Sequence, residues 1–174
     1  LLVCKKLLTI KSDITQYVEN GGTLAAVCGG YQLLGHYYQL ENEKIEGLKI
    51  LDIYTVQGSP RLIGNIILDS DYIGTTVVGF ENHGGRTFIN SHKPLGKVLY
   101  GYGNDGESGY EGVVYKNVVA TYLHGPLLPK NPVLADKIIE NAVTKKDASF
   151  VLSDIDSALE NTAHDYIIKR FLKK

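Results

Sequence analysis

The segment that most constrains the fold is a short apolar run, Leu24–Val27, which ends in one cysteine and two glycines. A continuous apolar run of this length is typical of a strand buried on both faces of a parallel sheet. Apolar residues then recur at helical spacing over Tyr31–Leu40, and a helix over residues 12–18, capped by Ser12 and Asp13, precedes the run. The order helix, strand, tight turn, helix predicts an α/β fold with Cys28 at the carboxyl end of a buried strand.

The rest of the chain is rich in predicted strands and closes with two helices. One helix has Asn131 as its cap and Pro132 in first position, and the other opens at Ser153-x-x-Asp156 and runs to Lys174. We see no repeat and no long linker, which favours a single domain. The strands are expected at Leu48–Val56, Leu62–Leu68, Thr75–Phe80, Lys97–Tyr100, Gly112–Tyr115 and Val118–Leu123.

Composition excludes several classes of protein. Of 174 residues, 44% are hydrophobic and 21% charged, and the net charge is −1, so nothing attracts nucleic acid or an anionic membrane over long range. No apolar run reaches the roughly 18 residues of a membrane span, and Lys5 and Lys6 interrupt the first apolar segment. Two cysteines without a spaced His/Cys cluster predict neither a disulfide framework nor a metal site. We expect a soluble cytoplasmic protein with a small ligand and no membrane insertion.

The setting of Cys28 is that of a nucleophile on a sharp strand-to-helix turn. Such a turn strains the backbone and requires small neighbours, which Ala26 and Gly30 provide. The start of the following helix favours a thiolate, and the Gly29 N–H can stabilise an oxyanion. The alternative is a small buried hydrophobe, as most free cysteines are, and this is our interpretation of Cys4. The flanking pattern favours the nucleophile for Cys28.

His124 is the predicted proton carrier for that thiol. It follows the strand Val118–Leu123, and the carboxyl ends of parallel strands meet at one edge of a sheet. Without Cys28, a hydrogen-bonded structural histidine would be the better interpretation. His36, His92 and His164 have no such setting and are predicted to be surface or structural residues.

Three motifs in this order resemble one enzyme family. Val27–Gln32 resembles the G-x-C-x-G-x-Q motif of class I glutamine amidotransferases, with Ala26 in place of the first glycine. Gly79–Gly84 resembles the G-Y-E-x-H-x-G segment of the cobyric-acid-synthase-like branch, and the segment around His124 reads YLHGPLLPKNP. The resemblance spans the chain and implies a flavodoxin-like parallel sheet flanked by helices, with an antiparallel β extension.

The resemblance also implies an activity. Cys28 attacks the side-chain carboxamide of L-glutamine, ammonia leaves with a proton relayed by His124, and water hydrolyses the thioester to glutamate. Arg61 pairs with the substrate α-carboxylate, for which an Arg fork is suited, although from the residues alone it could be a solvated charge. The substrate-binding residues implied by the resemblance are Gln32, Arg61, Asn82, His83 and Gly84.

Two departures from the family pattern affect the site. Pro126 stands where many class I members have a glutamate that orients the histidine, so a Cys–His dyad or an acid from elsewhere, with Glu81 a candidate, is implied. The family also has strands and a glycine-rich loop before the nucleophile, and that loop donates the second oxyanion N–H. We therefore expect residues 1–174 to form a single glutamine amidotransferase domain that lacks its N-terminal portion.

The chain carries no ATP-binding motif of its own. No G-x-x-x-x-G-K-[ST] occurs, and the G-x-G-x-x-G at Gly101–Gly106 opens no helix, so we expect no cofactor in this chain. The resemblance implies a heterodimer with a MurT-like Mur ligase subunit that holds ATP and Mg²⁺. That subunit receives the ammonia and amidates the D-glutamate of lipid II, a peptidoglycan precursor. The alternatives are an amidotransferase domain of cobyric or cobyrinic acid synthesis and a catalytically silent scaffold.

Overall fold

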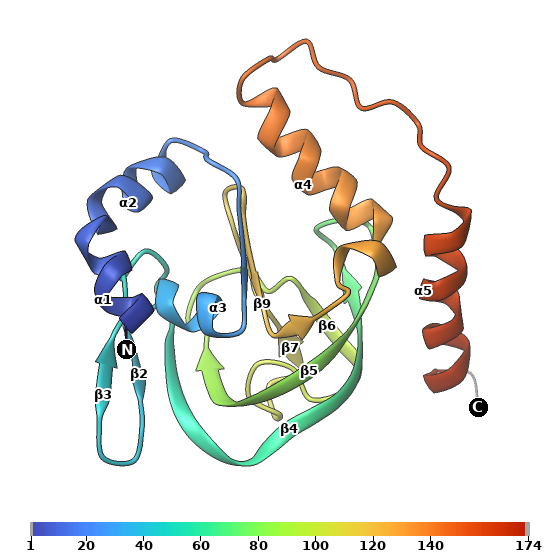
Figure 1. The fold of residues 1–174 in the computed structure, drawn as a ribbon. Coiled ribbons are helices and arrows are strands. Elements are labelled where there is room, and N and C mark those ends of the chain that lie inside the picture. The colour runs from blue at the N-terminus through green and yellow to red at the C-terminus, as the bar shows by residue number, and fades with distance from the viewer. Residues whose placement is uncertain (1, 173–174) are drawn as a thin grey trace.

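The computed structural model describes residues 2–172, which form two sheets with helices around them (Figure 1). The first helices and strands surround the cysteine turn, a long β-hairpin dominates the middle, and two helices close the chain. The elements are α1 (Leu2–Thr9), α2 (Lys11–Glu19), β1 (Leu24–Val27), α3 (Gly29–Leu34), β2 (Tyr37–Gln39), β3 (Lys44–Glu46), β4 (Tyr54–Ser70), β5 (Thr75–Phe88), β6 (Gly96–Tyr100), β7 (Tyr110–Glu111), β8 (Val113–Tyr115), β9 (Val118–Thr121), β10 (Leu123–His124), η1 (Leu128–Lys130), α4 (Pro132–Thr144) and α5 (Ala158–Phe171).

The two sheets meet at the end of β9. In the smaller sheet, β1 pairs with β9 in parallel and β9 pairs with β8 antiparallel. In the larger sheet, β10, β5, β4, β2 and β3 follow in that order, and β6 and β7 extend it from β4. The predicted α/β fold with a parallel unit and an antiparallel extension is confirmed, and the extension contains most of the β structure.

The predicted helix Tyr31–Leu40 is too long. α3 ends at Leu34, Gly35 is extended, and residues 37–39 form β2. A Cβ at Gly35 would lie 2.7 Å from the carbonyl oxygen of Ile53, so the chain turns where only glycine fits. The predicted strand Leu48–Val56 also starts late, because the amides of residues 48–51 instead donate to carbonyls at the end of α3.

The predicted helices near the two ends of the chain differ from the observed ones mainly in where they begin. α1 has no predicted counterpart, and α2 begins at Lys11, so Ser12 and Asp13 lie inside the helix rather than capping it. α4 begins at Pro132 as predicted. α5 begins at Ala158, whose N–H donates to the Asp156 carboxylate at 3.0 Å. Its predicted end at Lys174 lies outside the described residues.

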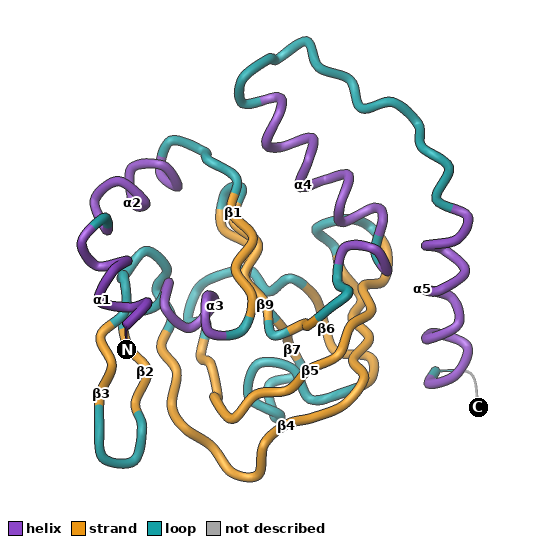
Figure 2. Tube along the Cα trace, in the orientation of Figure 1, coloured by secondary structure: helices purple, strands orange, loops and turns teal. Residues whose placement is uncertain are grey.

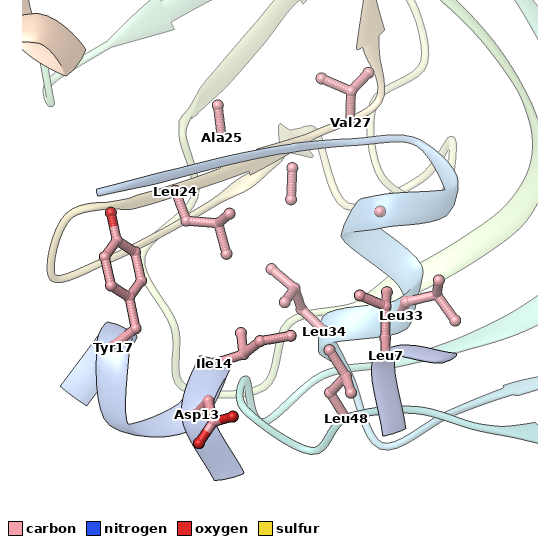
Figure 3. Close-up of a pocket in the computed structure, with 12 residues that line it drawn as sticks. Leu7, Asp13, Ile14, Tyr17, Leu24, Ala25, Val27, Leu33, Leu34 and Leu48 are labelled. Carbon is pink, nitrogen blue, oxygen red and sulfur yellow. The ribbon is translucent and has the colours of Figure 1, made fainter. Parts of the chain in front are cut away.

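The helices lie around the sheets rather than forming a closed shell. α1, α2 and α3 gather on one side of β1 and enclose an apolar cavity of about 570 Å³, which Leu24, Ile14 and Leu34 line (Figure 3). α5 stands at the opposite end of the molecule, after the long loop that follows α4 (Figure 2). His164 fixes it, with ring nitrogens 2.8 Å from Thr76 Oγ1 and from the Lys130 carbonyl oxygen. Within residues 2–172, no helix combines the length and apolarity needed to cross a membrane.

Candidate active site

Cys28 occupies the sharp turn predicted for it. It follows β1, caps α3, and has φ 52° and ψ −108°, a left-handed conformation that is strained for a residue with a side chain. Its N–H donates to the carbonyl oxygen of Thr121 at 2.9 Å, and its carbonyl oxygen accepts from the Gln32 N–H at 3.0 Å. Gly29 is the first residue of α3, where a backbone N–H has no partner within the helix. The thiol is partly exposed, whereas Cys4 is buried.

His124 lies three residues beyond the end of β9, the strand that pairs with β1. β1 and β9 run parallel with Val27 opposite Thr121, so Cys28 and the residues after Thr121 continue from adjacent strand ends. The chain then leaves this sheet at Tyr122 and joins the larger one, where His124 pairs with Phe80. Within the described residues, the His124 Nε2 atom is buried and has no hydrogen-bond partner. An unbonded imidazole nitrogen can take up or release a proton.

A network of side-chain hydrogen bonds centres on the buried Tyr122, in the break between β9 and β10. Its hydroxyl accepts from Gln32 Nε2 at 3.0 Å and lies 2.6 Å from Thr87 Oγ1, which lies 2.8 Å from Thr55 Oγ1. Burial, reinforced by the neighbouring Cys28 charge, raises the pKa of Tyr122 to about 12, so the phenol stays neutral. This network connects Gln32, a predicted pocket residue, with Tyr122, two residues before His124.

Gly85 gives Gln32 the space to reach this network. A Cβ at Gly85 would lie 2.6 Å from Gln32 Nε2, 2.7 Å from Thr55 Cγ2 and 2.8 Å from Tyr122 Oη. Distances below 3.0 Å essentially never occur for a real Cβ, so any side chain here would displace one of these groups. Glycine at this position is therefore required by the side chains of Gln32, Thr55 and Tyr122 that pack against it.

Arg61 and Asn82 form a joint polar group on the exposed side of the long hairpin. Arg61 donates through Nε and Nη2 to the Asn82 side-chain oxygen at 3.2 and 2.9 Å, and through Nη2 to its carbonyl oxygen at 3.1 Å. Gly84 lies beside them, since a Cβ there would lie 3.5 Å from Arg61 Nη1. The structure thus brings these three predicted substrate-binding residues together.

Tyr38 is a half-buried phenol in β2. Burial raises the pKa of Tyr38, and the charge of Arg61 opposes this shift.

His83 and Glu81 have a different place from the one predicted. His83 is 1% exposed and stacks on Tyr122, with ring centroids 3.7 Å apart. Its ring therefore packs against the hydrogen-bond network around Tyr122. Glu81 is fully buried, and its carboxylate accepts from the N–H groups of Tyr102 and Gly103 at 2.7 and 2.9 Å. Glu81 is thus engaged by the glycine-rich loop and forms no hydrogen bond with His124 within residues 2–172.

Sequence reasoning missed the residues that support the site. From the sequence, Tyr122 is predicted only as part of the strand Val118–Leu123, and no role is predicted for Gly85. The available signal was a tyrosine two positions before the candidate histidine, because a buried phenol needs a hydrogen-bond partner. Glu111 was also missed. It is a fully buried acid at the end of β7, a strand that Gly109 and Gly112 flank.

Comparison with known proteins agrees with the motifs. The model of the CobB/CobQ-like glutamine amidotransferase domain matches residues 2–132. Subunit GatD of the glutamine-hydrolysing lipid II isoglutaminyl synthase from Staphylococcus aureus is 44% identical over 170 residues, which is 97% of this chain and 69% of that protein. The GatD subunit from Streptococcus pneumoniae is 44% identical over 83% of this chain and 57% of its own length. Cobyric acid synthase from Listeria monocytogenes is 30% identical over 90% of this chain and 32% of its own length.

Proposed function

The chain belongs to the CobB/CobQ-like glutamine amidotransferase family, and we propose that it is the glutamine-hydrolysing part of a lipid II isoglutaminyl synthase. The observation that carries the proposal is that Cys28 and His124 both lie next to the end of β9. The Cys28 N–H is bonded to the Thr121 carbonyl oxygen, and His124 lies three residues after Thr121, at the end of β10. A thiol nucleophile and an imidazole that continue from adjacent strand ends can share one substrate carbonyl.

The reaction uses each of these groups in turn. The Cys28 thiol passes its proton to His124, Sγ attacks the δ-carboxamide carbon of glutamine, and the Gly29 N–H donates to the oxyanion. His124 gives that proton to the leaving nitrogen, the C–N bond breaks, and ammonia is released. His124 then takes a proton from water, which attacks the thioester, and returns it to the sulfur as the C–S bond breaks, so that glutamate is released and the thiol is restored.

We propose that the polar group formed by Arg61, Asn82 and Gly84 recognises the amino-acid end of glutamine. The Arg61 guanidinium is exposed and can pair with the α-carboxylate while Asn82 holds it in place. Asn82 and Gly84 offer main-chain and amide groups to the α-amino end. Gln32 lines the pocket at the thioester, held by the Tyr122 hydroxyl.

Ammonia released here needs a second active site to be useful. We propose that this site lies on a MurT-type Mur ligase subunit, which uses ATP and Mg²⁺ to activate the α-carboxylate of D-glutamate in lipid II and forms D-isoglutamine with the ammonia. The name of the relatives as subunits of a lipid II synthase supports this assignment. A cytoplasmic location would supply both glutamine and ATP.

A second candidate function is amidation of a corrinoid precursor. It is favoured by the cobyric acid synthases, which are 30–36% identical over shorter shares of their own length. A third possibility is a silent scaffold that only binds a ligase. The three functions predict different products from the same assay.

The test combines this chain with a Mur-ligase-type subunit, ATP, Mg²⁺, glutamine and lipid II. We expect glutamate release and D-isoglutamine formation, both lost in Cys28→Ala and strongly reduced in His124→Ala. Cys4→Ser is the matched control, since Cys4 is buried and its thiol donates to the Glu46 carbonyl oxygen at 3.1 Å. With free ammonia in place of glutamine, the Cys28→Ala complex should still form D-isoglutamine.

Two results would overturn the proposal. If Cys28→Ala supports glutamine-dependent amidation as well as the unmodified chain does, the thiol is not catalytic and the chain acts as a silent scaffold. If a corrinoid acid is amidated and lipid II is not, the assignment to lipid II is wrong.

A further inference from the structure

The chain changes sheets twice beside the candidate site. It passes from β7 in the larger sheet to β8 in the smaller one at Glu111 and Gly112, and it passes back from β9 to β10 at Tyr122. The two crossovers lie side by side because β8 pairs with β9, with Val113 opposite Ala120. A Cβ at Gly112 would lie 2.8 Å from the Ala120 carbonyl oxygen, which shows how closely the crossovers approach.

The Glu111 carboxylate bridges these crossovers. Its Oε1 atom accepts from the Tyr122 N–H at 2.6 Å, and its Oε2 atom accepts from the Thr121 hydroxyl at 2.8 Å. Thr121 Oγ1 in turn accepts from the Leu123 N–H at 3.0 Å. Where β9 breaks and its backbone leaves the sheet, this one acid therefore satisfies two consecutive backbone donors, one directly and one through Thr121.

Burial makes this arrangement necessary. Glu111, Tyr122 and Leu123 are 0% exposed, so water cannot satisfy the donors freed by the break. The break also separates two cores, since Tyr122 packs with Tyr31 and Ile53 whereas Leu123 packs with the apolar residues around β4 and β5. Without an acceptor at Glu111, the backbone at this point would have to shift to find another partner.

A shift at the break would move one catalytic group relative to the other. Cys28 is bonded to the Thr121 carbonyl oxygen on the near side of the break, and His124 follows on the far side. The bonds from Glu111 hold both sides, because they reach Thr121 and Tyr122 together.

We propose that Glu111 is a positioning residue that fixes the His124 imidazole relative to the Cys28 thiol by holding the β9–β10 strand break. It acts through the backbone and touches no substrate. The inference rests on the proposed function, because it concerns the geometry of that Cys–His pair. It gives the chain a substitute for the orienting glutamate that Pro126 replaces.

The surroundings of Glu111 decide which substitutions are informative. Burial, with a smaller contribution from the charge of Glu81, raises the pKa of Glu111 to about 8, although the hydrogen bonds from Tyr122 and Thr121 act in the opposite direction. Tyr31 and Tyr122 face the same space, and the charge of Glu111 contributes to the raised pKa of Tyr31. In either protonation state an oxygen remains to accept from Tyr122, so glutamine can replace this acid whereas leucine cannot.

The experiment measures kcat and KM for glutamine hydrolysis in the complete complex. Glu111→Leu should lower kcat by about 10- to 100-fold with KM for glutamine within about twofold, as expected for a misplaced catalytic group. Glu111→Gln should restore kcat to within about threefold. Ser70→Ala is the control for stability, because Ser70 is buried, donates to the Leu95 carbonyl oxygen at 2.6 Å, and lies outside the site. It should leave kcat unchanged.

A double-mutant cycle shows whether Glu111 acts through His124. The readout is the rate at which a glutamine-analogue diazo-ketone alkylates Cys28, followed by peptide mass spectrometry. Glu111→Leu should slow alkylation about tenfold in the otherwise unmodified chain and less than twofold in the His124→Ala background. If Glu111→Leu does not fold, as judged by circular dichroism, Thr121→Val replaces it, and the same non-additivity is expected.

The outcomes separate the two proposals. An unmodified chain that neither releases glutamate nor reacts at Cys28 refutes the proposed function, and the role of Glu111 falls with it. If the unmodified chain is active and His124→Ala is impaired, a folded Glu111→Leu variant with normal kcat overturns the positioning role alone. An equal effect of the leucine substitution in both backgrounds overturns it as well.

Discussion

Gly85→Ala tests whether the tight packing of three side chains around Gly85 supports both the fold and the site. The added Cβ would lie 2.6 Å from Gln32 Nε2, 2.7 Å from Thr55 Cγ2 and 2.8 Å from Tyr122 Oη. Thr55 and Tyr122 are 0% exposed, so the backbone must move or Gln32 must leave the Tyr122 hydroxyl. Overpacking of this kind costs about 1–3 kcal/mol, and loss of the hydrogen bond adds about 1 kcal/mol.

We expect Gly85→Ala to lower the free energy of unfolding by about 2–4 kcal/mol and kcat/KM for glutamine by about tenfold or more. Urea denaturation followed by far-UV circular dichroism measures the first quantity, since the chain has no tryptophan. The matched control is Gly64→Ala in β4, where a Cβ would meet no atom within 4 Å. If both variants unfold with free energies within about 0.5 kcal/mol of the unmodified chain, the steric argument is wrong.

Three further predictions concern charge and hydrogen bonding. Arg61→Lys keeps the charge but loses the fork on Asn82, so KM for glutamine should rise about tenfold or more, and an unchanged KM in steady-state kinetics would refute this role. Tyr122→Phe removes the hydroxyl partner of Gln32 Nε2 and leaves Thr87 Oγ1 with Thr55 Oγ1 alone, so it should lower the free energy of unfolding by about 1–3 kcal/mol in urea denaturation, whereas a neutral result would contradict the network. Because the pKa of Glu111 is raised from 4.5 to about 8, the native state keeps a proton that the unfolded chain has released, so this group lowers stability as pH rises through that window. Glu111→Gln should remove up to about 1.4 kcal/mol per pH unit of this slope, and parallel stability curves for the two proteins would contradict the shift.

The sequence predicted the cysteine turn because its local signals agree. The apolar run before Cys28, the small neighbours and the helical spacing afterwards all specify strand, turn and helix within one short segment. His124 could be singled out because a largely apolar segment, Val118–Leu123, precedes it. Cys28 follows β1 of the parallel pair directly, whereas His124 lies beyond the break after β9, in β10 of the larger sheet.

The rest depended on contacts between distant segments. α3 ends at Leu34 because residues 48–51 bond to its last carbonyls and because Ile53 blocks a side chain at Gly35, and no local pattern encodes either contact. Glu111 gains its role only when two crossovers meet. Glu81 was the candidate acid for His124, but its carboxylate accepts from backbone N–H groups of a distant loop. The sequence shows only that this loop is rich in glycine.

The most direct test of the account is the site at which a glutamine-analogue diazo-ketone modifies the protein. We predict one adduct, on the partly exposed Cys28, with buried Cys4 unmodified, and competition by glutamine. Preferential modification of Cys4, or labelling of Cys28 that glutamine does not slow, would contradict the assignment of Cys28 as the nucleophile.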